Sequence, residues 1–85
     1  MKFKIENFRE EDRKLIEENL KEFNSEVEKE WRKIFKIGKI PKAELKNDEI
    51  VVDIPLMFRI IAKKEQIKSS LEAFLNDRGI KVKLV

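Results

Sequence analysis

Eighty-five residues are enough for one domain with a single hydrophobic core and too few for two. Charged residues make up 44% of the chain, but the formal net charge is only +3, so a nucleic-acid site would have to depend on local clustering of basic residues. The absence of Cys and His excludes disulfides, thiol nucleophiles, imidazole bases and the usual zinc ligands.

The first residues are expected to form a short strand followed by the start of a helix. Phe3 and Ile5 alternate with lysines, which is typical of a half-buried strand over residues 2–5. Asn7 and Glu10 have the spacing of a helix capping pair. We therefore expect a helix to begin near Asn7.

An apolar stripe then predicts a core-facing helical segment. Its members recur at steps of three or four residues: Ile16, Leu20, Phe23, Val27, Trp31 and Ile34. Asn24 and Ser25 interrupt the helix-forming residues, and Ser25 with Glu28 resembles a second capping box. The pattern leaves open whether the segment is one helix or two meeting near Asn24. Gly38 fits a left-handed cap at its end.

The stretch from Pro41 to Ile54 predicts a two-stranded antiparallel hairpin that turns at Asn47 and Asp48. This turn produces one apolar face and one charged face. The facing pairs are Ala43 with Val52 and Leu45 with Ile50 on the apolar side, and Lys42 with Asp53 and Lys46 with Glu49 on the charged side. The apolar face requires a cover, which the flanking helical segments supply.

A second long helix is expected after Pro55, which cannot donate a hydrogen bond within the sheet. We expect this helix to begin at Leu56 and to bend near Lys63 and Lys64. Its apolar face would contain Met57, Ile60, Ile61, Ile67, Leu71, Phe74 and Leu75. Gly79 predicts its end, and alternation over residues 80–84 predicts a last strand.

Together these segments predict a single α+β domain over residues 1–85, with the element order (β)-α-β-β-α-β. The strands should form one mostly antiparallel sheet covered by helices on one face. This architecture serves many functions, so the predicted fold assigns none.

We expect no enzyme, catalytic residue, cofactor or metal site in this chain. The paired carboxylates are spaced as solvated residues of helix surfaces. Ser69 and Ser70 have no imidazole to activate them, and Lys63 or Lys64 would act as a base only if desolvated. No Asp-rich calcium-binding loop is present.

Local basic clusters offer a candidate nucleic-acid site, because helical spacing can align Arg59, Lys63 and Lys64 on one strip that suits phosphates. The candidate nucleic-acid-binding residues are Arg59, Lys63, Lys64, Lys68, Lys36 and Lys39. Trp31 belongs to the apolar stripe, which favours a core role over binding. Phe58 either fills the core or remains exposed as a partner-binding anchor.

Several of these residues together resemble the DciA family of bacterial replicative-helicase loaders. The resemblance covers about residues 26–85. It consists of the Trp31–Ile34 segment, Pro41 before a hairpin, an aromatic-led helix and a closing strand, with the matching positions Trp31, Ile34, Pro41, Ile50, Val52, Ile54, Phe58, Ile80, Val82 and Leu84.

This resemblance implies a K-homology-like fold, binding to single-stranded or duplex DNA, and interaction with the hexameric replicative helicase. Basic residues would neutralise phosphates, and apolar residues, with Phe58 and Trp31 as candidates, would hold the protein partner. The Gly-x-x-Gly loop of nucleic-acid-binding K-homology domains is absent, so binding would use another surface.

Two other functions remain open: a small RNA-binding or ribosome-associated protein, and a structural or designed domain without activity. The Lys- and Glu-rich composition is found in thermostable proteins and in idealised designs. The longest apolar run, Ile54 to Phe58, is too short to cross a bilayer, so we expect a soluble cytoplasmic protein without a membrane or small-molecule partner.

Overall fold

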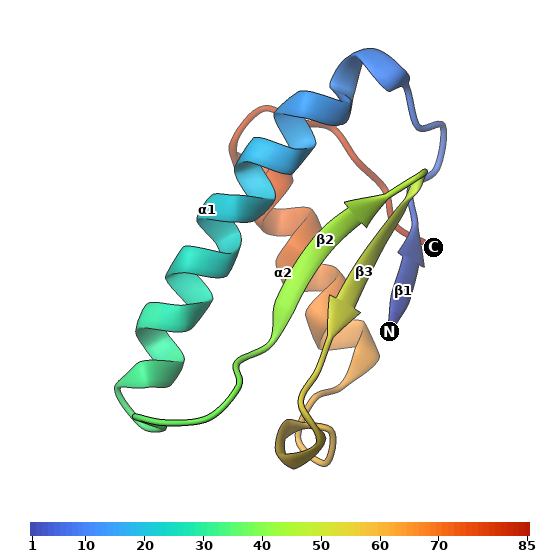
Figure 1. The fold of residues 1–85 in the computed structure, drawn as a ribbon. Coiled ribbons are helices and arrows are strands. Elements are labelled where there is room, and N and C mark those ends of the chain that lie inside the picture. Colours follow the sequence, from blue (N-terminus) through green and yellow to red (C-terminus); the bar gives the residue numbers. More distant parts are fainter.

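The chain forms three strands and two α-helices in a computed structural model that describes residues 1–85 (Figure 1). Their order is β1 (Lys2–Lys4), α1 (Arg13–Arg32), β2 (Lys42–Lys46), β3 (Glu49–Asp53) and α2 (Lys64–Asp77). A short 3₁₀ turn precedes each helix, at Glu10–Asp12 and at Leu56–Phe58. Both helices cover the same face of the sheet (Figure 1), which confirms the predicted α+β class.

The sheet is antiparallel throughout and has the strand order β1-β3-β2. The end of the chain extends the sheet beyond β1, because Leu84 bridges Ile5, and the backbones of Lys4 and Val85 exchange hydrogen bonds of 3.0 and 2.9 Å. The predicted order is confirmed from β1 to α2, but the last strand predicted over residues 80–84 is wrong, because only Leu84 forms an isolated bridge; the K-homology-like topology is not confirmed.

The hairpin has the predicted register at all four positions: Ala43 with Val52, Leu45 with Ile50, Lys42 with Asp53 and Lys46 with Glu49. Asn47 in the turn has a φ of 55°, a left-handed conformation that Asn tolerates better than most residues. The two charged pairs face each other across the hairpin but form no salt bridge, because neither brings a lysine nitrogen within 4.0 Å of a carboxylate oxygen.

The core lies between the sheet and the two helices and contains only apolar side chains. The sheet side of the core consists of alternate residues of each strand, because successive side chains of a strand point to opposite faces of the sheet. The buried residues are Phe3, Ile5, Ile16, Leu20, Ala43, Ile50, Val52, Ile54, Phe58, Leu71, Leu75, Ile80 and Leu84. No polar or charged side chain is buried.

The first helical segment is one continuous helix, α1, without a break at Asn24. The expected capping pair at Asn7 and Glu10 does not form: the 3₁₀ turn intervenes, and α1 begins only at Arg13. At the other end α1 stops at Arg32, so Ile34, predicted to continue the apolar stripe, is 71% exposed. Gly38 has the expected positive φ of 105° but lies in the following loop, beyond the helix end.

Asn24 explains why α1 continues through a position that resembles an interruption. Its side-chain amide donates to the Ala43 carbonyl and its oxygen accepts from the Ala43 amide, both at 2.8 Å. Ala43 lies in β2, an edge strand of the sheet. The residue that reads locally as a cap therefore serves a tertiary contact instead.

The second helix is shorter than predicted. Leu56–Phe58 form an isolated 3₁₀ turn, and Lys63 is extended, with φ −98° and ψ 129°, so α2 begins at Lys64. A short apolar run does not distinguish a turn from a buried helix by periodicity. The predicted apolar face is consequently wrong at Met57, Ile60 and Ile61, which are exposed.

Candidate docking surface

Two loops lie side by side at the end of the molecule opposite the hairpin turn (Figure 1). Residues 33–41 connect α1 to β2, and residues 54–63 connect β3 to α2. We call these two segments together the loop end. The first loop begins where α1 ends at Arg32 and runs to Pro41, just before β2, and the second begins after β3 ends at Asp53, next to Pro55, which cannot donate a hydrogen bond within the sheet.

Three aromatic rings hold the two loops together. The centre of the Phe58 ring lies 4.7 Å from that of Trp31 and 5.0 Å from that of Phe35. Phe58 is only 2% exposed, so it fills the core and does not present its ring as an exposed anchor. Trp31 remains half-buried at the end of α1. Of the two candidate partner-binding aromatics, only Trp31 is therefore partly accessible.

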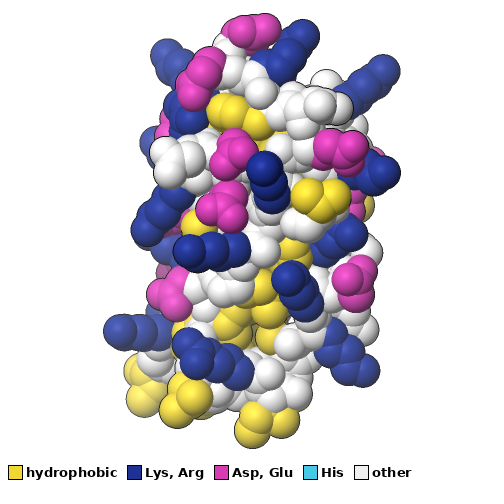
Figure 2. Space-filling model, turned by 90° about the vertical axis from the view of Figure 1, so that its right-hand side faces the viewer, with side chains coloured by type: hydrophobic (Ala, Val, Ile, Leu, Met, Phe, Trp, Pro, Cys, Tyr) yellow, Lys and Arg dark blue, Asp and Glu magenta, His cyan; other side chains and the backbone are white.

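The loop end exposes six large aliphatic side chains. Ile60 is 91% exposed and Ile37 is 88% exposed. The full set is Ile34, Ile37, Leu56, Met57, Ile60 and Ile61. Figure 2 shows apolar side chains gathered at the lower end of one face, beside Lys and Arg and apart from Asp and Glu. Single exposed aliphatic residues are ordinary, but a cluster of this kind is a candidate interaction surface.

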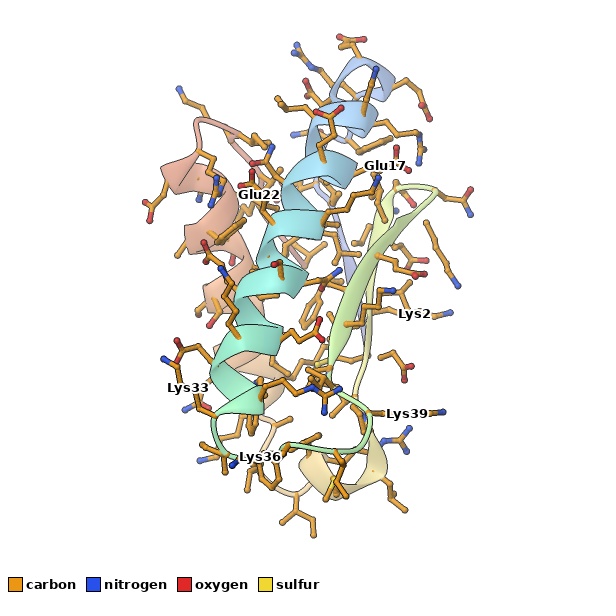
Figure 3. All side chains as sticks on the ribbon, turned by 60° about the vertical axis from the view of Figure 1, so that its left-hand side comes forward. Lys2, Glu17, Glu22, Lys33, Lys36 and Lys39 are labelled. Atoms are coloured by element: carbon orange, nitrogen blue, oxygen red, sulfur yellow. The ribbon has the colours of Figure 1, made fainter.

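Basic residues surround these aliphatic side chains, and acidic residues are absent from both loops. The cations of the loop end are Lys33, Lys36, Lys39, Arg59 and Lys63, with Lys42 and Lys64 at its borders. Figure 3 shows Lys33, Lys36 and Lys39 around the lower end, whereas Glu17 and Glu22 lie in the upper half. The rest of the chain therefore carries a net negative charge.

The structure brings some of the candidate nucleic-acid-binding residues together and separates others. Lys36 and Lys39 share one loop, and Arg59 and Lys63 share the other. The predicted helical strip does not form, because Arg59 precedes α2 and its Nε donates to the Ile54 carbonyl at 3.1 Å.

The last two candidates, Lys64 and Lys68, lie on α2, away from the 33–41 loop. Lys64 Nζ is 5.8 Å from the centre of the Phe3 ring, on the side of α2 that faces β1. Lys68 is half-buried. Of these six basic residues, none has a carboxylate oxygen within 4.0 Å of its side-chain nitrogens.

An apolar groove of about 390 Å³ opens between α1 and α2 next to the loop end. Phe23, Val27 and Trp31 form its α1 wall, and Ile67 and Ser70 belong to its α2 wall. The floor consists of sheet and loop residues: Ala43, Val52, Ile54 and Phe58. Its only charged lining residues are Lys42 and Lys63.

The groove exists because the helices are joined at one end only. The Phe23 and Phe74 rings meet edge to face at 5.2 Å, and Arg78 pairs with both Glu22 and Glu26. Beyond these contacts the two helices separate toward the loop end (Figure 1). Their facing apolar side chains, such as Val27 and Ile67, then remain half-buried.

The charged groups with a shifted pKa lie far from the loop end. A hydrogen bond from Arg13 lowers the pKa of the Glu10 carboxyl, and the same hydrogen bond raises the pKa of Arg13. Both residues are at the opposite end, beside the hairpin turn. No group of three or more acidic side chains is arranged to hold a metal ion, and neither helix is long and apolar enough to span a membrane.

Sequence reasoning missed the exposed aliphatic residues and the groove. It assigned Ile34, Met57, Ile60 and Ile61 to buried helical faces. One signal was available: neither 31–43 nor 54–64 contains an acidic residue, although Asp and Glu are abundant elsewhere. Segments that exclude one sign of charge within a mixed surface are candidates for contact with a partner.

Comparison with protein-family models, with curated proteins and with solved structures found no match to this chain.

Proposed function

We propose that this protein is a cytoplasmic, non-enzymatic binding module that associates with DNA and holds a protein partner, both through its loop end. The observation that carries the proposal is the joint exposure of six aliphatic side chains and five cations there, with no Asp or Glu in either loop. Phosphates attract the cations, and a protein surface covers the aliphatic groups. The lack of any buried polar or charged side chain supports a binding role over a catalytic one.

Lys36, Lys39, Arg59 and Lys63 are the residues that we propose for DNA contact. Their side chains are exposed and free of ion pairs, so they neutralise phosphate without first breaking a salt bridge. Contact with the backbone alone would be largely independent of DNA sequence.

The open face of the sheet is a weaker candidate for nucleic acid. Its strand residues include no aromatic side chain on which a base would stack: Lys2, Lys4, Lys42, Glu44, Lys46, Glu49, Val51 and Asp53. Sheet-based RNA recognition relies on such aromatic residues. The exposed face of the sheet therefore does not favour RNA binding. We propose that DNA contacts the loop end instead.

The resemblance to the DciA loaders suggests the replicative helicase as the protein partner. Three of the residues that carry the resemblance, Trp31, Ile34 and Phe58, lie at the loop end or beside it. Ile34 is exposed and Trp31 is partly accessible, so both are available to a partner. We propose that the module brings such a partner to DNA without hydrolysing nucleotide itself.

The DNA proposal is tested by titrating the protein with single-stranded DNA, duplex DNA and structured RNA at two salt concentrations. The variant is Lys36→Glu/Lys39→Glu, which reverses two exposed cations. We expect it to bind DNA at least about tenfold more weakly. Because two phosphate contacts are lost, the slope of log affinity against log salt should fall by about 1.4 to 1.8.

The matched control is Lys14→Glu/Lys81→Glu, which changes net charge by the same amount at exposed positions outside the loop end. It should retain most of the affinity. Equal losses in the two variants would show that net charge, and not the loop end, governs binding. Absence of salt-dependent binding to either form of DNA would refute the DNA part of the proposal, and preference for structured RNA would transfer it to RNA.

A further inference from the structure

We propose that the groove between α1 and α2 binds an amphipathic α-helix of a partner protein, with apolar side chains on one face and Asp or Glu along its flanks. The inference deepens the proposed function and rests on it, because it names the chemistry of the protein partner. It concerns the groove, whereas DNA contact is assigned to the exposed loop cations, of which only Lys63 also lines the groove.

The walls and floor of the groove suit the apolar face of a helix. Val27 and Trp31 are four residues apart on α1 and line the same wall, with Ile67 across from them. A volume of about 390 Å³ admits a few side chains rather than a whole helix. An amphipathic helix inserts apolar side chains at positions i, i+3 or i+4, and i+7 while its backbone stays above the groove.

The loop end favours a macromolecule over a small apolar ligand as the occupant. A small ligand would fill the groove and leave aliphatic side chains such as Ile37, Leu56 and Ile60 exposed to water. A helix that continues past the groove covers some of these side chains as well. Burying this additional apolar surface adds about 25 cal/mol for each Å² removed from water, which only a larger partner gains.

Charge selects an acidic helix. Lys42 and Lys63 are the only charged residues that line the groove. The carboxylates on the nearby half of α1 already have cationic partners: Glu26 with Arg78, Glu28 with Arg32 and Glu30 with Lys33. The charge of the groove lining is therefore positive, so a helix flanked by Asp or Glu is attracted and one flanked by Lys is repelled.

Trp31 provides a direct readout, because it is the only Trp in the chain and lines the groove. The probe is a synthetic helical peptide of about 16 residues, four turns, with Leu at i, i+3, i+4 and i+7 positions and Glu elsewhere. We expect saturable changes in Trp31 fluorescence as the peptide is added. A peptide with Lys in place of Glu should bind at least about tenfold more weakly.

Two neighbouring serines on α2 supply a matched pair of variants. Ser70 lines the groove, whereas Ser69 does not, and both are exposed. Ser70→Phe should fill the groove and weaken peptide binding at least about tenfold, and Ser69→Phe should bind like the original chain. Thermal unfolding of both variants checks that the fold is retained. Lys42→Gln/Lys63→Gln should weaken the Glu peptide severalfold and leave a Gln-substituted peptide unaffected.

Several outcomes would overturn the inference. These are an unchanged Trp31 signal, equal binding of the Glu and Lys peptides, or equal losses in the two serine variants. A Trp31 response to oleate or to phosphatidylserine vesicles but not to peptide would assign the groove to lipid instead. Self-association that Ser70→Phe abolishes, measured by sedimentation, would assign it to a second copy of this chain.

DNA titration of the same variants separates this inference from the proposed function. Ser70→Phe should lose peptide binding and keep DNA binding. Lys36→Glu/Lys39→Glu should lose DNA binding and keep most peptide binding. Failure of one pattern with success of the other shows which of the two proposals is wrong.

Discussion

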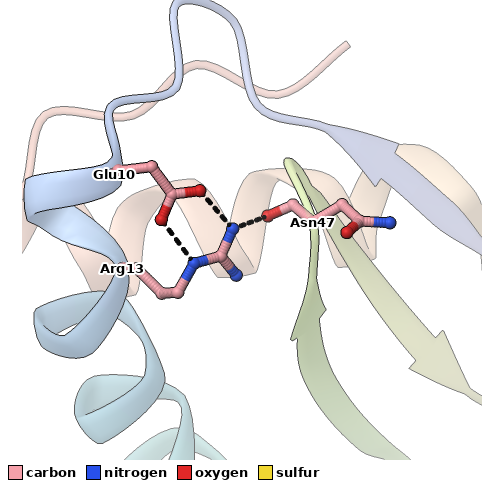
Figure 4. Close-up of polar contacts among 3 residues, drawn as sticks. All are labelled: Glu10, Arg13 and Asn47. Carbon is pink, nitrogen blue, oxygen red and sulfur yellow. Dashed lines mark hydrogen bonds and ion pairs between the residues drawn. The ribbon is translucent and has the colours of Figure 1, made fainter.

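Arg13 connects the start of α1 to the hairpin turn (Figure 4). Its Nε and one terminal nitrogen each donate to the Glu10 carboxylate at 2.8 Å, and the same terminal nitrogen donates to the Asn47 carbonyl at 2.9 Å. The paired geometry is the stronger form of Arg–carboxylate contact. The hydrogen bond from Arg13 lowers the pKa of Glu10, since it stabilises the charged carboxylate.

The lowered pKa of Glu10 predicts how this contact depends on pH. The folded pKa lies below the unfolded one, so the contribution to stability is fully present above the unfolded pKa, about 4.3 for Glu, and is lost as pH falls through the folded pKa. The pKa of Arg13 is raised, so its own contribution persists at every pH below its unfolded pKa.

An NMR titration of the Glu10 side-chain carboxyl measures this directly. In Arg13→Gln the midpoint should move upward toward the ordinary value for Glu, and in Lys14→Gln it should not move. If Arg13→Gln leaves the midpoint where it was, the hydrogen bond is absent in solution.

At the scale of elements, Asn24 protects the edge of the sheet. β2 is an edge strand, and such strands present unpaired backbone groups to other chains. The Asn24 amide satisfies both the N–H and the C=O of Ala43, and so occupies the part of the edge where a further strand would pair. One side chain of α1 thereby joins helix to sheet and blocks further strand addition.

Replacing Asn24 by Ala should lower the free energy of unfolding by about 1 to 3 kcal/mol, because two hydrogen bonds to partly buried backbone groups are lost. Urea unfolding followed by circular dichroism measures the change. The control is Asn19→Ala on the same helix, whose amide bonds only to the local Leu15 carbonyl at an exposed site. That variant should change the value by less than about 0.5 kcal/mol. Equal effects would show that the Asn24 contact is not formed.

Contacts between elements explain one prediction that the sequence left open and one that was wrong. Local spacing did not decide between one first helix and two, because Asn24 and Ser25 are compatible with a cap. The contact of Asn24 with Ala43 decided it. The second helix was predicted to begin at Leu56. It begins at Lys64 instead, because Phe58 packs against Trp31 and Phe35.

At the scale of the whole molecule, the two ends differ in chemistry. The end at the hairpin turn carries the Glu10–Arg13 contact and mixed charges, whereas the loop end carries exposed aliphatic residues and cations (Figures 2 and 3). Exposed aliphatic groups contribute little to folding, which is consistent with the binding role that we propose for them.

We therefore expect substitutions of the exposed loop-end residues to change surface hydrophobicity with little effect on the free energy of unfolding. Ile37→Ser/Ile60→Ser removes the two most exposed aliphatic side chains of the loop end, and should change the free energy of unfolding by no more than about 1 kcal/mol. Retention on a hydrophobic interaction column should fall. Ile50→Ser, at a fully buried position, should instead cost more than about 3 kcal/mol. A comparable loss in the double variant would show that the loop-end residues pack in the core.

The sequence by itself determined the order of the three strands and two helices, the hairpin register and the inward face of each strand. These depend on interactions between near neighbours, namely the period of two, the turn at Asn47 and the Pro and Gly positions. Tertiary structure alone decided the continuity of α1, the start of α2, the burial of Phe58 and the exposure of Ile34, Ile37 and Ile60. An apolar side chain is buried only where another element covers it, and the separation of α1 from α2 leaves the groove and the loop end uncovered.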